Sequence, residues 1–240
     1  MTLKDIFKDL SYGELSGLSI GNLIPDDNES EPDPKSYKQI ISHINRALTK
    51  IYSRFLLSSK ETYIQQSEEI AEYILDRRYA QSNTDSDIAL ADRYVADSAA
   101  TPFQDDVLKI EQCYDELGNL LFMNDPTEDL SIYTPSYRSI QVPYPNNWNV
   151  IGVQYRAAHP KLTWTPNEDA EGVLVAVPES LYEALLYYVA YRASPQPIGG
   201  VDGAQTFLQL YELACQGVEN QGLYIQAEWT NWRFDNAGWV

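Results

Sequence analysis

Residues 33–55 read DPKSYKQIISHINRALTKIYSRF and contain the clearest helical pattern of the chain. Asp33 is a residue type preferred at helix N-caps, and Pro34 suits the first helical position because the N–H that it lacks would be unpaired there. The apolar side chains that follow recur at spacings of three and four residues, which puts them on one face: Tyr37, Ile40, Ile41, Ile44, Leu48, Ile51 and Phe55. This pattern predicts a long helix that buries one side.

Two more helices are predicted toward the C-terminal end, and a short one at 2–9. Residues 178–193 begin at Pro178 and are apolar on nearly every face, which is typical of a helix buried on several sides. Residues 202–220 carry a single apolar stripe, and Gly222 follows as a helix-stop residue. That stripe consists of Phe207, Leu210, Tyr211, Ala214 and Val218.

Strand patterns fill the middle of the chain. The stretches SIQVP (139–143), NVIGVQYRA (149–157) and GVLVAV (172–177) are short, β-branched and bounded by Pro, Asn or Gly. Residues 107–123 contain two apolar runs around the turn-forming segment 115–119, which is a hairpin signal. We therefore expect strands in all four stretches.

Helices at both ends and strands between them predict an α+β fold. We expect a helical bundle formed by the N- and C-terminal helices, with an inserted β-rich region. The expected division is 1–59 for the N-terminal helices, 60–177 for the β-rich insertion, 178–224 for the C-terminal helices and 225–240 for an extended tail. The pattern of residues 61–79 does not decide between helix and strand, because the Glu-rich centre suits a helix whereas TYI and AEYILD suit strands.

The charge is the strongest global feature. There are 35 acidic residues against 17 basic ones, a formal net charge of −18. Wrapping nucleic acid or adhering to an anionic membrane needs clustered Lys and Arg, so both are disfavoured. The N-terminal residues have no signal-peptide pattern, and the apolar stretch 184–191 is far shorter than the roughly 20 residues of a membrane span. Cys113 and Cys215 stand far apart, which predicts neither a disulfide framework nor a zinc site.

Catalytic signatures are absent from the sequence. No phosphate-binding G-x-x-x-x-G-K loop and no G-x-S-x-G elbow occurs. His43 lies on the flank of the first long helix and His159 precedes Pro160 in a turn, and both are interpreted as structural. A glycosidase needs only two acids at the right separation. The presence of 35 acids therefore does not distinguish a glycosidase from a protein without that activity. We expect no enzyme activity, no cofactor and no metal.

The chain has 18 tyrosines and five tryptophans. Such residues are enriched as anchors in protein–protein interfaces, and they can also stack on sugars. On the 178–193 helix, Tyr182, Tyr187 and Tyr191 fit either a buried core or a subunit interface. Both interpretations stay open.

The C-terminal stretch WTNWRFDNAGWV, residues 229–240, holds three of the five tryptophans. Trp229, Trp232 and Trp239 together can bury on the order of 600 Å², which stabilises by about 15 kcal/mol at most. Ordering twelve residues costs roughly 18 kcal/mol. Because these terms nearly cancel, the tail should order only in a preformed groove, as a docking segment does.

Several stretches together resemble a known family. They are LSYGELSGLSIGN (10–22), KQIISHINRALTKIYSRFLL (38–57), PSYRSIQVP (135–143), VIGVQYRAAHP (150–160), VLVAVPESLYEALLYYVAYRA (173–193), FLQLYELACQGVENQGLY (207–224) and FDNAGWV (234–240). In this order, over nearly the whole chain, they resemble the adaptor proteins of short-tailed bacteriophages. These adaptors form the head-to-tail connector ring below the portal.

The resemblance implies a helical bundle with a β-rich extension, assembled as a ring of typically twelve copies in the virion neck. The ring docks to the portal on one side and to the tail nozzle on the other, and double-stranded DNA passes through its lumen without specific binding. Assembly would take place in the bacterial cytoplasm, with no membrane partner. In related connectors the C-terminal segment reaches along or into the portal. The resemblance assigns that interface role to Trp229, Trp232, Phe234, Trp239 and Val240, and it favours strands for 61–79.

Alternatives remain at this point. One is a tail-tube or nozzle structural protein, and another is a carbohydrate-binding or glycan-cleaving virion protein, favoured by the aromatic and acidic content. The connector hypothesis predicts an acidic lumen, since acidic walls repel phosphate and let DNA slide. Whether the tail docks on the portal or on a neighbouring subunit is open.

Overall fold

The computed structural model describes residues 1–15, 34–85, 87–165, 168, 170–194 and 202–222. The chain is α+β and divides into two compact units. One unit comprises Met1–Ile51 and Lys161–Val240, and the other comprises Tyr52–Pro160. They are called the helical unit and the β unit below, and each is described by itself.

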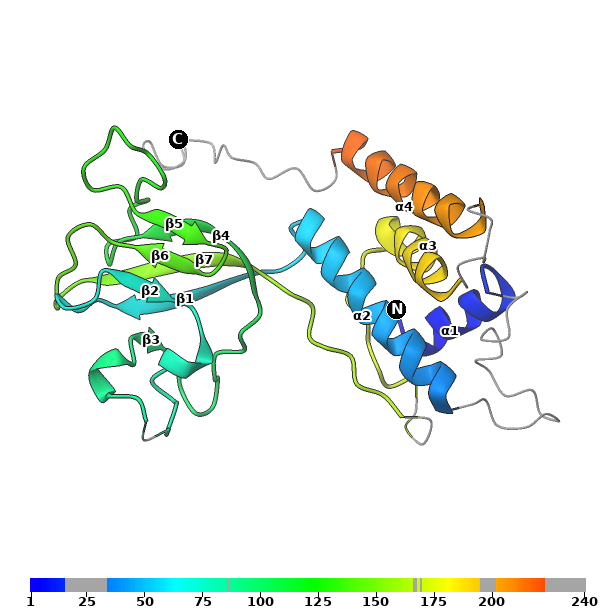
Figure 1. Cartoon of the computed structure of the whole chain (residues 1–240), viewed down its shortest axis with the longest axis horizontal. Helices are drawn as coiled ribbons and strands as arrows, with labels where there is room; N and C mark the ends of the chain where they lie inside the picture. The colour runs from blue at the N-terminus through cyan, green and yellow to red at the C-terminus, as the bar shows by residue number, and fades with distance from the viewer. Residues whose placement is uncertain (16–33, 86, 166–167, 169, 195–201, 223–240) are drawn as a thin grey trace, which may run out of the picture. The chain divides into compact units, whose positions relative to one another are not determined.

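The predicted helices are all present (Figure 1): α1 (Leu3–Tyr12), α2 (Pro34–Arg54), α3 (Tyr182–Ala193) and α4 (Asp202–Asn220). A capping box starts α1, because the Thr2 hydroxyl accepts from the Asp5 N–H and the Asp5 carboxylate accepts from the Thr2 N–H. The start of α2 at Pro34 is confirmed, whereas its expected cap Asp33 lies outside the described residues. Gly222 follows α4 with φ of 67°, as expected of a helix-stop glycine.

The stripe predicted on α2 is confirmed as buried, from Tyr37 through Phe55. Tyr37 also belongs to an aromatic cluster of the helical unit. The Phe7 ring on α1 lies 5.7 Å from the Tyr37 ring and 5.2 Å from the Trp164 ring, and Tyr37 and Trp164 are 4.9 Å apart. Edge-on and tilted ring contacts of this kind stabilise beyond the effect of the area that the rings bury. They connect α1, α2 and the segment that precedes α3.

Burial on several sides is also confirmed for α3. A 3-10 turn, η3 (Glu179–Leu181), precedes it, and it packs against α4 and contacts α1 (Figure 1). The ring of Tyr188 on α3 lies 5.1 Å from that of Tyr211 on α4. The fully or nearly fully buried residues of α3 are Ala184, Leu185, Leu186, Val189, Ala190 and Ala193.

The β unit contains two antiparallel sheets (Figure 1). The first has the strand order β3-β1-β7-β4 and the second has the order β2-β6-β5. Their bounds are β1 (Ser59–Gln65), β2 (Glu72–Ile74), β3 (Val95–Ala96), β4 (Val107–Tyr114), β5 (Tyr133–Ser136), β6 (Ser139–Gln141) and β7 (Val150–Ala157), with 3-10 turns η1 (Arg77–Tyr79) and η2 (Leu90–Asp92). One apolar core, which includes Ile64, Tyr73, Ile140 and Val153, joins residues from both sheets.

Most strand predictions are confirmed. The strands expected at 139–143 and 149–157 are β6 and β7, and the segment 61–79 contains most of β1 and all of β2. In 107–123, β4 is followed by a turn in which the Gly118 N–H bonds to the Asp115 carbonyl. Among the described residues, the returning strand of that hairpin is reduced to one isolated bridge, between Tyr114 and Leu120.

The prediction of a strand at 172–177 is wrong. Only Leu174 pairs there, in an isolated bridge with Thr2. The Leu3 N–H donates to the Val173 carbonyl at 2.9 Å, and the Val175 N–H donates to the Met1 carbonyl at 3.0 Å. Because α1 begins at Leu3, the partner backbone turns into a helix after two residues, and no ladder can extend.

Candidate functional site

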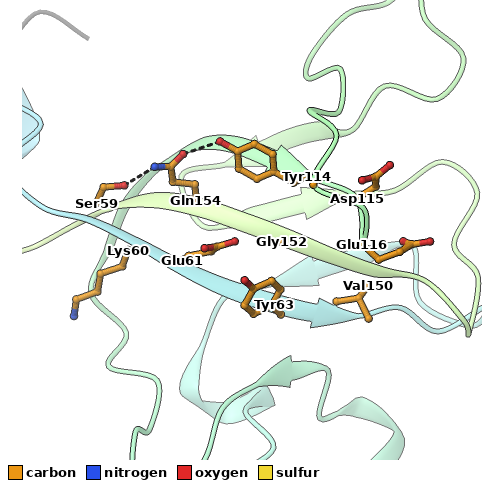
Figure 2. A pocket seen from close by; sticks show the side chains of 11 residues that line it. Ser59, Lys60, Glu61, Tyr63, Tyr114, Asp115, Glu116, Val150, Gly152 and Gln154 are labelled. Atoms are coloured by element: carbon orange, nitrogen blue, oxygen red, sulfur yellow. Dashed lines mark hydrogen bonds between the residues drawn. The ribbon is translucent and has the colours of Figure 1, made fainter. Parts of the chain in front are cut away.

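A pocket of about 710 Å³ lies on the four-stranded sheet of the β unit (Figure 2). We call it the sheet pocket. Its lining comes from β1, β7, the end of β4 and the turn after β4: Ser59, Lys60, Glu61, Tyr63, Tyr114, Asp115, Glu116, Gly118, Val150, Gly152 and Gln154. The opposite face of the same strands belongs to the core.

Strand alternation explains why these side chains meet. On β1, Ser59, Glu61 and Tyr63 lie on one face, because successive side chains of a strand point to opposite sides; Thr62 and Ile64 are buried on the other. In the antiparallel register Tyr63 pairs with Gly152 of β7. Gly152 in turn pairs with Tyr114 of β4. Two tyrosines from different strands therefore flank one glycine.

Gly152 keeps the floor of the sheet pocket open. A Cβ atom at this position would lie 3.3 Å from a carboxylate oxygen of Glu61 and 3.5 Å from the Tyr63 ring. A larger residue would fill the space between the two tyrosines. Tyr63 is 48% exposed, so its ring remains available to a ligand.

A chain of hydrogen bonds holds one wall of the pocket (Figure 2). The Tyr114 hydroxyl lies 3.0 Å from Oε1 of Gln154, and Nε2 of Gln154 donates to Oγ of Ser59 at 2.9 Å. Oε1 of Gln112 is also within hydrogen-bonding distance of the Tyr114 hydroxyl. These contacts fix the Gln154 amide and the Tyr114 ring against β7.

The carboxylates dominate the charge of the pocket. Glu61, Asp115 and Glu116 line it, and the one cation among its described lining residues, Lys60, pairs with Asp106 at 2.5 Å. Figure 2 shows the Lys60 side chain directed away from Glu61. A hydrogen bond to Glu61, followed by its negative charge, raises the pKa of Tyr63. With three acidic side chains against one lysine, the formal charge of the pocket lining is negative.

Asp115 is already used in building the turn. Its carboxylate accepts from the N–H groups of Leu117 and Asn119 at 2.9 and 2.7 Å, and from Nδ2 of Asn119 at 2.8 Å. The side-chain hydrogen bond from Asn119 is the largest cause that lowers the Asp115 pKa. The carboxylates without such a structural role are those of Glu61 and Glu116.

The residues predicted as an interface lie elsewhere. Tyr182, Tyr187 and Tyr191 are half-buried on α3, and none of them lines the sheet pocket. The Tyr182 hydroxyl donates to Oδ2 of Asp9 at 2.6 Å, and burial, together with this contact, raises the Tyr182 pKa. The predicted tail residues lie outside the described residues: Trp229, Trp232, Phe234, Trp239 and Val240.

Sequence reasoning did not find the sheet pocket. The usable signal was the pair Glu61 and Tyr63, a carboxylate and an aromatic ring at strand spacing on an exposed face. Its significance depends on Gly152 and Tyr114, which are distant in sequence and become neighbours only through strand pairing. The helix-or-strand ambiguity of 61–79 concealed that spacing.

Neither protein-family models nor curated proteins give a match to this chain. Within the described residues, no group of three or more His, Cys, Asp and Glu side chains could hold a metal ion. None of the described helices is both long and apolar enough to cross a membrane.

Proposed function

We propose that the chain is a structural head-to-tail connector of a short-tailed bacteriophage. In this proposal it is not an enzyme, and copies of it form a ring, of typically twelve subunits, between the portal and the tail nozzle in the virion neck. The observation that carries the proposal is the division of the chain. Its two ends form one compact helical unit and the stretch between them forms a β unit, as the sequence resemblance to phage adaptors implies.

The finer architecture is part of the proposal. We infer that α1 to α4 act as a helical bundle into which the β unit is inserted. The ring interface would be built from the helices at 35–57, 178–194 and 202–220. Tyr182, Tyr187 and Tyr191 favour this assignment because they leave aromatic surface on α3 that its own unit does not fully cover. Aromatic side chains of this kind are frequent anchors in subunit interfaces.

The charge of the chain fits passage of DNA. With a net charge of −18, a ring of many copies generates a strongly negative field. A lumen lined mainly by acidic residues would repel phosphates, so double-stranded DNA would slide through it without specific binding. A map of the ring with a mainly basic channel would contradict this part of the proposal.

Mass measurement is the direct test of the connector function. The purified chain is measured alone and after mixing with the portal protein encoded in the same genome. The expected result is a complex whose mass corresponds to a full ring of this chain on the portal, even where the free chain is monomeric. Absence of any complex with that portal contradicts the proposal.

A further inference from the structure

The sheet pocket is lined by several hydrogen-bond acceptors. Gln154 directs its amide nitrogen at Ser59, and its amide oxygen faces the Tyr114 hydroxyl. The Tyr63 ring lies on the same face of β1 as Glu61 and is 48% exposed. The charged groups that the pocket presents to a ligand are the carboxylates of Glu61 and Glu116, whose oxygens only accept. The complementary ligand group carries several donors and a positive charge.

The turn that forms one wall of the pocket has the same charge. Residues 115–119 contain Asp115 and Glu116 and neither Lys nor Arg. Lys60 is held by Asp106 and does not neutralise Glu61. A second copy of this surface would be repelled, so the partner surface must be basic.

We propose that the sheet pocket binds an arginine side chain of a partner protein. A guanidinium group has five N–H donors in a planar fork, which matches carboxylate acceptors, and it stacks on aromatic faces. The Tyr63 ring supplies such a face, and Gly152 leaves room beside it. Carboxylates and an aromatic ring thus meet in one cavity of sufficient volume.

The rim of the pocket indicates a protein rather than a free small cation. Leu117, between two lining residues, is 81% exposed, and Leu120, which forms an isolated bridge with the lining residue Tyr114, is 61% exposed. Exposed apolar side chains gathered beside a pocket are typical of protein-binding surfaces. They would contact the residues on either side of the inserted arginine.

A sugar fits the pocket less well. Sugar hydroxyls carry no charge, whereas hydrogen bonds to carboxylates are strengthened when the donor is positively charged. The proposal does not depend on the connector function, since the binding test below uses the isolated full-length chain without portal.

Binding is tested with a fluorescent, end-capped peptide Gly-Leu-Arg-Leu-Gly and its twin in which citrulline replaces arginine. Anisotropy titrations at about 0.15 M salt limit non-specific attraction by the acidic chain. We expect the arginine peptide to bind at least about tenfold more tightly, because citrulline lacks the charge that strengthens the hydrogen bonds. Amide NMR signals of Gly152 and Gly118 should shift with the arginine peptide.

Substitutions localise the effect. Glu61→Gln and Glu116→Gln should each weaken arginine-peptide binding by about fivefold to tenfold. Glu69→Gln, an exposed acid outside the pocket lining, is the matched control and should change binding by less than about twofold. Because Glu116 is exposed in a turn, its variant keeps the test valid if Glu61→Gln disturbs the sheet.

Three results would overturn the proposal. The first is equal or undetectable binding of the arginine and citrulline peptides. The second is an equal loss in Glu69→Gln, which would show general attraction by the charge of the chain. The third is a shift of the Gly152 signal with maltohexaose but not with the arginine peptide, which would make the pocket a sugar site.

Discussion

Asn45 and Leu162 form a reciprocal pair of hydrogen bonds. Nδ2 of Asn45 donates to the Leu162 carbonyl at 2.9 Å, and the Leu162 N–H donates to Oδ1 of Asn45 at 2.8 Å. A side chain on α2 thus takes the place of a strand partner for one residue of the segment that leads to α3. Because Leu162 is buried, its backbone groups have little access to water as a substitute.

Asn45→Ala should lower the free energy of unfolding of the helical unit by about 1–3 kcal/mol, since both backbone groups of Leu162 lose their partner. Urea unfolding followed by circular dichroism measures the change. Gln39→Ala, an exposed position of the same helix, is the control and should stay within about 0.5 kcal/mol. Equal effects of the two substitutions would show that the pair does not stabilise the unit.

The pair of Glu111 and Arg156 makes a second stability prediction. Their charged groups lie 2.8 Å apart, and each side chain is only 10% exposed. Arg156 also donates to the Ser53 carbonyl at 2.7 Å. Glu111→Ala leaves a nearly buried guanidinium without its counter-charge, so we expect a loss of about 3 kcal/mol in the β unit.

The matched control for Glu111→Ala is an exposed ion pair. Lys4 and Glu171 pair in the helical unit with side chains 56% and 60% exposed. Glu171→Ala should cost less than about 1 kcal/mol, since water and salt screen exposed pairs. Calorimetric melting of both variants measures the difference, and a Glu111→Ala protein as stable as Glu171→Ala would refute the buried-pair argument.

The long helices could be predicted from sequence because their signal is local and repeated. The stripe of α2 recurs over several turns, from Tyr37 to Phe55, and each position is buried as expected. The strand at 172–177 could not be judged in this way. Its apolar residues suit a strand, but strand formation needs a partner, and the partner near Thr2 becomes a helix.

The sheet pocket shows the same limit at a functional site. Alternation in β1 predicts that Glu61 and Tyr63 share a face once the segment is known to be a strand. It does not predict that Gly152 lies opposite Tyr63, with Tyr114 beyond it. Non-local register creates the cavity, and it cannot be derived from the periodicity of one segment.

His43 gives the chain a pH-dependent stability. It is 8% exposed on α2, and neither ring nitrogen has a hydrogen-bond partner among the described residues. Burial lowers the His43 pKa, and the positive charges of Arg192 and Arg46 lower it further. The unfolded chain binds the proton more readily, so stability should decline as the pH falls through about 6.5 toward the folded pKa.

His43→Leu should remove the part of the acid-induced loss of stability that His43 causes. At pH about 7.5 the free energy of unfolding should be unchanged or higher, because leucine replaces a buried polar ring that has no hydrogen-bond partner among the described residues. Urea titrations at pH about 7.5 and 5.5 measure the difference in the free energy of unfolding between the two pH values. Gln39→Ala is the control and should retain that difference. If His43→Leu keeps the full difference between the two pH values, another group is responsible.

Tyr187 tests the proposed subunit interface. It is half-buried on α3, and substitution to serine removes aromatic surface that the proposed ring would bury. Tyr187→Ser should leave the monomer folded but weaken assembly on the portal by about tenfold or more, as loss of an aromatic anchor does. Native mass spectrometry of the mixture measures ring occupancy.

Tyr12→Ser is the control, since Tyr12 is 72% exposed on α1 and lies outside the proposed interface. Equal losses of ring occupancy in the two variants would contradict the role of Tyr187.

Deletion of residues 229–240 tests the tail as a docking segment. The free energy gained by burying this stretch nearly equals the free energy lost by ordering it. The deleted chain should therefore keep its unfolding transition and circular dichroism spectrum, but it should fail to bind the portal. A triple variant of the full-length chain should give the same result. In it, alanine replaces Trp229, Trp232 and Trp239. Trp148→Ala is the control, because Trp148 is 86% exposed in the β unit, and it should still join. If either tail change abolishes folding instead, these tryptophans belong to the core and the docking hypothesis is wrong.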